Sequence, residues 1–200
     1  MNAKSGLVVW MVVLAVGCTA VKQAHVAPDW KTADATRVKR LVVVVAPAPK
    51  GDLKLAAMFG LMARNYVNLK REFIVKANTT AALPTPPEKF DPKGLCGPGI
   101  EGVLWLAPTV LDQGQSVHEE VEGKLLRCPD GAEVWGAHAE GTWKSSDTAL
   151  AQMSGNYVKD LGPGVAPYLA PTFHLLKPTL DTLPNPTLTD EEQVEKTESD

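Results

Sequence analysis

The pattern of apolar and polar positions predicts a β-α-β unit in the first half of the chain. Residues 41–46 form a continuous apolar run rich in β-branched side chains, which is typical of a strand covered on both faces. After Asp52, a residue type that favours helix N-caps, apolar side chains recur at helical spacing, and residues 72–76 predict a second strand. A strand-helix-strand segment of this kind places its two strands parallel. The helical stripe, which we expect to face the core rather than a ligand, comprises Leu55, Met58, Phe59, Met62, Tyr66 and Leu69.

The second half of the sequence predicts antiparallel strands. Residues 100–108 have the apolar character of a third, central strand, while residues 117–128 and 133–143 flank a turn that contains Gly131. We expect this last hairpin to pair Val121 with Gly141, and therefore Glu122 with Glu140. The face of the hairpin that contains Val121 then carries small, apolar side chains. The other face, which we expect to be solvated, carries Glu120, Glu122, Lys124, His138, Glu140 and Thr142.

The C-terminal part of the sequence predicts helices. Residues 147–159 predict one helix, and Thr189 with Glu192 forms a capping box that opens a short terminal helix. Residues 165–183 are strongly apolar and are expected to pack on the sheet, although they could instead offer an apolar face to a partner or a bilayer. The prolines inside this stretch predict a kinked or segmented helix. These are Pro167, Pro171 and Pro178.

Together these elements predict a single globular domain of the α+β (α/β) class. It starts with the β-α-β unit, continues as an antiparallel meander, and forms a mixed five-stranded sheet packed by helices, the C-terminal helices included. Residues 78–99, dense in proline and glycine, predict a loop without any motif that assigns it a role.

The N-terminus carries the most specific signal in the sequence. Lys4 precedes an apolar segment, residues 6–16, which is shorter than the roughly 20 residues that a membrane-spanning helix needs. The run Leu14-Ala15-Val16-Gly17-Cys18 resembles the lipobox at which bacterial signal peptidases cut before a lipid-modified cysteine. The resemblance implies a lipoprotein signal peptide over residues 1–17 and acyl chains on Cys18 that anchor the chain to a membrane. The alternatives are an ordinary secretory peptide and an anchor that is never cut.

After the predicted signal peptide, the sequence divides into three segments. We expect a polar tether over residues 18–36, the globular domain over residues 37–188 and an acidic C-terminal tail over residues 189–200. Thr19 stands where enterobacterial lipoproteins carry their sorting residue. By that resemblance, the absence of aspartate implies the outer membrane of the cell envelope, with the protein facing the periplasm.

Charge argues against a nucleic-acid partner. The chain has a formal net charge of −3, and six acidic residues with Lys196 as the only base lie between positions 189 and 200. The body of the protein is therefore close to neutral and has no basic stripe.

Two further cysteines predict a disulfide. Cys96 and Cys128 are an even pair in an oxidising compartment. Their midpoint, Asp112, lies in the turn sequence Asp-Gln-Gly-Gln-Ser, so two strands folding back about this turn bring both cysteines to the same end of a hairpin. Free thiols are the alternative, and a metal site is a further one.

Catalytic motifs are missing from the sequence. It contains no nucleophile elbow, zinc-protease helix motif, phosphate loop or dinucleotide fingerprint. We therefore expect no catalytic residue and no cofactor. The alternative is a metal constellation of His118, His138 and Glu140 on the polar face of the hairpin, which would support a metal-assisted hydrolase.

Five segments resemble an uncharacterised lipoprotein family of myxobacteria and leptospires. They are the lipobox, residues 37–45, residues 96–104 (Cys-Gly-Pro-Gly-Ile-Glu-Gly-Val-Leu), residues 141–143 and residues 183–189 (Leu-Pro-Asn-Pro-Thr-Leu-Thr). That family has no assigned activity and so implies no site residues. The order of elements also resembles small domains of periplasmic lipoproteins that assist secretion or activate cell-wall synthases, an analogy of fold alone.

The sequence thus predicts a membrane-anchored, non-enzymatic envelope lipoprotein. Its expected role is to bind or assist an envelope protein or a cell-wall component. Besides the metal-assisted hydrolase, the open alternative is a lipid or small-ligand carrier, which requires an apolar cavity between the helices and the sheet.

Overall fold

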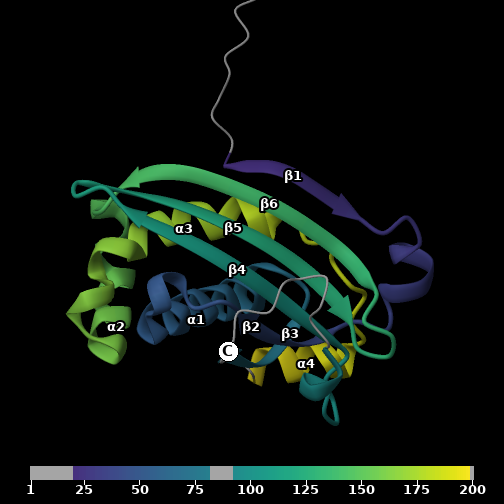
Figure 1. Cartoon of the computed structure of the whole chain (residues 1–200). Coiled ribbons are helices and arrows are strands. Elements are labelled where there is room, and N and C mark those ends of the chain that lie inside the picture. Colours follow the sequence, from purple (N-terminus) through teal and green to yellow (C-terminus); the bar gives the residue numbers. More distant parts are fainter. Residues whose placement is uncertain (1–19, 82–91, 199–200) are drawn as a thin grey trace, which may run out of the picture.

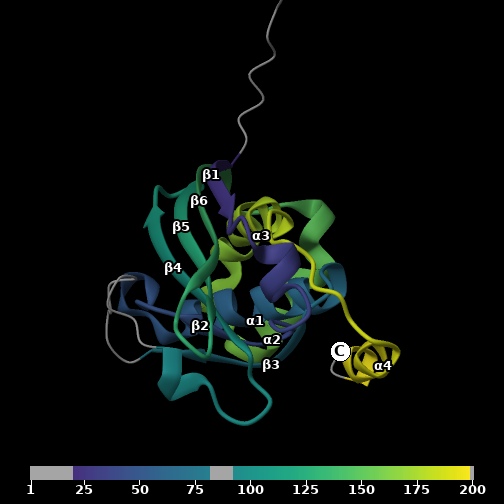
Figure 2. The same ribbon diagram turned by 90° about the vertical axis from the view of Figure 1, so that its right-hand side faces the viewer.

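A curved six-stranded sheet with helices against one face forms the body of the protein (Figure 1). The computed structural model describes residues 20–81 and 92–198. The strand order is β1-β6-β5-β4-β2-β3, with α1 and α3 side by side under the sheet and α4 set apart from them (Figure 2). The strands are β1 (Val21–Val26), β2 (Arg40–Val45), β3 (Ile74–Thr80), β4 (Gly102–Asp112), β5 (Ser116–Arg127) and β6 (Glu133–Lys144). The α-helices are α1 (Leu53–Lys70), α2 (Ala151–Leu161), α3 (Ala166–Asp181) and α4 (Asp190–Glu198).

The predicted β-α-β unit is confirmed. Strands β2 and β3 are parallel and α1 connects them, beginning where the Asp52 carboxylate accepts hydrogen bonds from the backbone N–H groups of Lys54 and Leu55, at 2.7 and 3.3 Å. Strand β4 pairs with the other edge of β2 and is also parallel to it, so β2 is the central strand of the three parallel strands. The predicted core stripe of α1 is only partly buried, since Tyr66 is half-buried and Leu69 is 65% exposed.

The antiparallel meander β4-β5-β6 is also present, but the register predicted for its second hairpin was wrong. Val121 lies opposite Ala139 instead of Gly141, and Glu122 lies opposite His138 instead of Glu140. The tight turn between Arg127 and Ala132 shifts the pairing by three residues from the predicted one, and a bulge in β6 then moves it back by one. Because the total shift is an even number of residues, the apolar and polar faces remain as predicted.

The segment predicted as a polar tether, residues 18–36, is mostly part of the domain. Strand β1 pairs antiparallel with β6, and a π-helical turn, Trp30–Asp34, follows it. The Trp30 side chain is only 4% exposed and contacts the ring of Phe73. Strand β1 therefore makes the sheet six-stranded instead of five-stranded. Its exposed side chains give it no apolar alternation, which is why the hydrophobic pattern did not predict it.

Helix α3 is one continuous helix and is not divided into segments, although its prolines predicted a kinked or segmented helix. Pro171 and Pro178 both lie inside it, and Pro171 is buried. The helix packs across β5 and β6 and beside α1, which agrees with the expectation that residues 165–183 belong to the core. Its buried leucines are Leu169, Leu175, Leu176 and Leu180.

The acidic C-terminal segment, predicted as a tail over residues 189–200, is docked on the domain as α4. The capping box forms, because the Thr189 N–H donates to the Glu192 carboxylate at 2.8 Å and Glu192 N–H donates back to the Thr189 hydroxyl at 3.3 Å. Glu192 pairs with Lys39 at 2.6 Å, and Glu195 pairs with Arg40 at 2.6 Å. No side chain of α4 is buried, so charge pairing and hydrogen bonds hold this helix in place.

Cys96 and Cys128 are joined by a disulfide, as the sequence predicted, with their Cα atoms 5.7 Å apart. The bridge ties the segment before β4 to the end of β5, on the sheet face opposite the helices. There it adjoins a second, smaller apolar cluster that includes Val44, Val103 and Trp105.

We expect Cys128→Ser to destabilise the protein markedly. The cysteines are 32 residues apart, and a loop of this length constrains the unfolded chain by roughly 3–4 kcal/mol in the chain-entropy model. Thermal unfolding followed by circular dichroism should show a fall in Tm. The Cys96→Ser/Cys128→Ser double variant should have the same Tm as the single variant. Melting of Cys128→Ser at the wild-type temperature would contradict the expected stabilisation.

Candidate functional site

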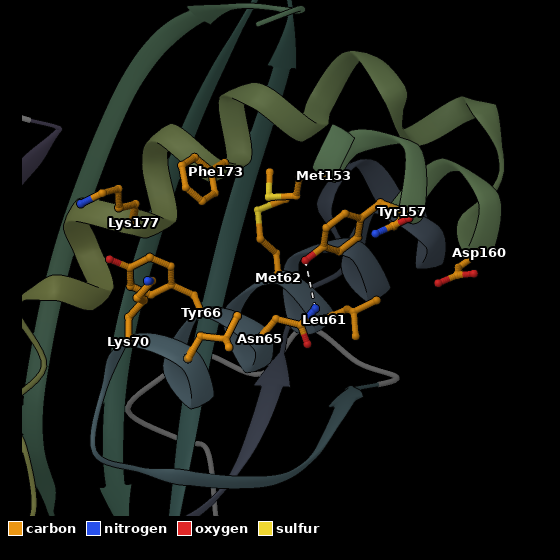
Figure 3. Close-up of a pocket in the computed structure, with 12 residues that line it drawn as sticks. Leu61, Met62, Asn65, Tyr66, Lys70, Met153, Tyr157, Asp160, Phe173 and Lys177 are labelled. Atoms are coloured by element: carbon orange, nitrogen blue, oxygen red, sulfur yellow. Dashed lines mark hydrogen bonds between the residues drawn. The ribbon is translucent and has the colours of Figure 1, made fainter. Parts of the chain in front are cut away.

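An apolar groove of about 520 Å³ lies between α1, α2 and α3 (Figure 3). Its apolar and aromatic lining comes from all three helices, because residues near the end of α1 are left uncovered where α2 crosses toward α3. The lining comprises Leu61, Met62, Tyr66, Leu69, Met153, Tyr157 and Phe173. The carrier hypothesis placed such a cavity between the helices and the sheet, whereas the structure places it among the helices.

Hydrogen bonds and ring contacts define the walls of the groove. Asn65 on α1 donates its side-chain amide to the Tyr157 hydroxyl of α2 at 3.2 Å. The ring of Tyr66 meets Phe173 of α3 edge-on, with centroids 6.4 Å apart, and its hydroxyl donates to Asp181. These contacts join the three helices in pairs and hold the groove open.

The polar residues of the groove are unevenly placed. Lys70 and Lys177 lie beside Tyr66 at one end, and Asp160 lies at the other end, beyond Tyr157 (Figure 3). Lys177 also pairs with Asp181 at 2.9 Å. Although burial raises the pKa of Asp181, hydrogen bonds from Tyr66 and Lys177 lower it overall, so this carboxylate stays ionised. Asp181 thus compensates the charge of Lys177, and Lys70 is left as the uncompensated positive charge at this end among the described residues.

The candidate metal ligands predicted from the sequence are only partly brought together. His138 and Glu140 join Glu120 in a group whose candidate ligand atoms lie within 4.8 Å of one another, on the outer face of β5 and β6. His118 is not in this group, because its Nδ1 atom lies 3.0 Å from the Thr142 hydroxyl. His138 Nε2 lies 2.8 Å from the Glu120 carboxylate, and Glu140 has Lys22 at 3.6 Å. The group is thus partly satisfied by its own contacts, and a partly exposed acidic cluster does not by itself identify a metal site.

Glu119 is a buried acidic residue that we did not predict. Its side chain lies between β5 and α3, fully shielded from solvent, with one carboxyl oxygen hydrogen-bonded to the Thr172 hydroxyl at 2.9 Å. The other oxygen has no hydrogen-bond partner among the residues that the structure describes. Burial raises the pKa of Glu119 to about 8, against the smaller opposite effect of the Thr172 hydrogen bond. The alternation of β5 contains the signal, because Glu119 falls between the inward-facing Val117 and Val121.

The structure does not test the predicted lipid anchor. Residues 1–17 and Cys18 lie outside the described residues. Among the helices of the described ranges, 20–81 and 92–198, none has the length and apolar character needed to cross a membrane.

Comparisons with known proteins identify no family. No protein-family model and no curated protein matches the sequence. Among solved structures, the PelC dodecamer from Paraburkholderia phytofirmans is 17% identical with a TM-score of 0.41, over 66% of this chain and 88% of that one. Lipoprotein GNA1162 from Neisseria meningitidis is 16% identical with a TM-score of 0.40, over 61% and 96%. A hypothetical protein from Chlamydia trachomatis is 15% identical with a TM-score of 0.38, over 70% and 94%. Similarity at this level identifies neither a family nor an activity.

Proposed function

We propose that this protein is a lipid-anchored, non-enzymatic lipoprotein of the bacterial cell envelope that binds a partner in the groove between α1, α2 and α3. The anchor is supported by the lipobox that ends at Cys18. The observation that carries the binding role is the groove, a concave and mostly apolar site with a few polar groups at its ends, which is the usual form of a binding site.

The side chains that could serve catalysis have structural contacts instead. Cys96 and Cys128 form the disulfide. The Ser116 hydroxyl donates to the side chain of Gln113 at 3.3 Å within the turn, while the nearby His118 contacts Thr142. These contacts support a binding or accessory role in the envelope over a hydrolytic one.

The position of β1 adds a constraint on the anchored protein. Only Thr19 and Ala20 separate Cys18 from the first residue of β1. A fully extended chain spans at most about 3.6 Å per residue, so the length of this link allows at most about 11 Å between Cys18 and the first residue of β1. We therefore propose that the domain works against the membrane surface. We also propose that this membrane is the outer membrane and that the domain faces the periplasm, because Thr19 and not aspartate follows Cys18.

Cys18→Ser is expected to remove the protein from its membrane. Without the thiol no acyl chain is attached, and each lost methylene contributes about 0.8 kcal/mol to membrane binding. Cell fractionation with mass spectrometry should find the variant unacylated and either uncleaved or misplaced. The Cys96→Ser/Cys128→Ser double variant, which keeps Cys18, should remain acylated. A Cys18→Ser variant with unchanged mass and unchanged fractionation would refute the lipid anchor.

A further inference from the structure

We propose that the groove between α1, α2 and α3 binds a long-chain fatty acid, with the acyl chain along the apolar lining and the carboxylate at Lys70 and Lys177. This inference rests on the proposed function, because it names the chemistry of the partner that the groove would hold beside the membrane.

The apolar part of the groove suits a flexible hydrocarbon chain. Leu69 is 65% exposed, and Leu61, Met153 and Phe173 are only half-buried, so the helices leave apolar surface in contact with water. Covering such surface is favourable, and the two methionines of the groove, Met62 and Met153, adapt easily to the shape of an apolar chain.

The size of the groove favours a narrow occupant over a partner helix. Its volume of about 520 Å³ falls within the range of roughly 300–1,000 Å³ that is usual for small-molecule sites. A helix is about 10 Å wide with its side chains, whereas a single acyl chain is much narrower. A groove of this volume therefore suits a single acyl chain.

The charged residues at the two ends of the groove set the expected direction of the bound acyl chain. Lys70 and Lys177 flank the aromatic ring of Tyr66 at one end of the groove (Figure 3). Asp181 is paired with Lys177 and compensates its charge, so the attraction for an anion at this end comes mainly from Lys70, which has no ion-pair partner among the residues of the described ranges. Asp160 at the opposite end repels a carboxylate. An anionic head group is thus attracted to the lysine end and the methyl end of the chain points toward Met153 and Tyr157.

The test uses the acylated full-length protein in phosphatidylcholine nanodiscs with a photoactivatable palmitate. After irradiation, mass spectrometry should find the adduct on peptides of α1, α2 or α3 that line the groove. Palmitate should compete for this labelling, and its uncharged methyl ester should compete about tenfold less well, which is the effect of losing about 1.4 kcal/mol.

Matched variants locate the site. Leu69→Asp and Lys70→Gln should reduce the labelling at least about fivefold. The controls are Leu53→Asp, a leucine of the same helix that is 66% exposed but outside the groove, and Lys159→Gln, an exposed lysine of α2 that does not line the groove. Both controls should label as the wild type does. Circular dichroism of all four variants confirms that each one folds.

Three outcomes would overturn the inference. These are labelling outside the groove, equal competition by palmitate and its methyl ester, and equal loss of labelling in groove and control variants. A photoreactive amino acid at position 69 that captures a protein in cells, in place of a fatty acid, would also overturn it while supporting the proposed binding role. Failure of the anchor test with Cys18→Ser would instead remove the proposed function.

Discussion

A chain that ends at Gly164 is expected to aggregate instead of folding. This truncation removes α3, which covers the inner face of β5 and β6 and packs beside α1. The four buried leucines of α3 alone contribute roughly 6–12 kcal/mol through burial of their side chains. Domains are typically stable by about 5–15 kcal/mol, so the loss is of the same size as the whole stability. Size-exclusion chromatography and thermal unfolding should find aggregates without a cooperative transition.

Truncation after Leu188 is the matched control. It removes α4, which buries no side chain, and the ion pairs of α4 to Arg40 and Lys76 are partly exposed pairs worth about 1 kcal/mol or less each. The pair to Lys39, whose side chain is only 8% exposed, contributes more, so we expect a fall in Tm with the cooperative transition retained. If the chain ending at Gly164 folds as well as this one, α3 is not part of the core.

The elements with a strong hydrophobic period could be predicted from the sequence. The continuous apolar run of β2 and the capped stripe of α1 have few alternative structures, because both must be buried. The bridge between Cys96 and Cys128 also followed from the position of the turn between β4 and β5. In each case a local signal and the global fold agree.

Elements held by backbone pairing or by charge could not be predicted in this way. Strand β1 is an edge strand with exposed side chains, so only its pairing with β6 defines it. Helix α4 itself was predicted from its capping box, but its docking was not, because it depends on ion pairs to Lys39 and Arg40, which lie about 150 positions earlier in the sequence. A hydrophobic pattern carries no information on either kind of contact.

The groove was missed for a related reason. Its residues on α1 continue the stripe that the helical period assigns to the core, and the period does not reveal that the stripe extends beyond the neighbouring helices. Leu69 has the correct spacing for a buried position but is left exposed near the end of α1. Which part of an apolar stripe becomes a binding surface depends on where α2 and α3 pack, and that is a tertiary property.

Glu119→Gln is expected to abolish a large pH dependence of stability. Burial raises the pKa of Glu119 in the folded protein to about 8 from an ordinary value of 4.5, so the folded state holds this proton more tightly than the unfolded chain does. The stabilisation is therefore fully present below pH 4.5 and is lost as the pH rises through about 8. At 1.36 kcal/mol per pKa unit, the change amounts to roughly 5 kcal/mol at most.

Glutamine has nearly the shape of the protonated carboxyl group and stays neutral at every pH, so Glu119→Gln should gain stability relative to the wild type between pH 6 and pH 9. Glu122→Gln, which changes a half-exposed carboxylate on the same strand, should follow the wild-type curve. Urea denaturation at several pH values measures both differences. Parallel curves for the wild type and Glu119→Gln over this range would show that Glu119 does not hold its proton beneath α3, and that ionisation of Glu119 is accommodated between β5 and α3 at no cost to the fold.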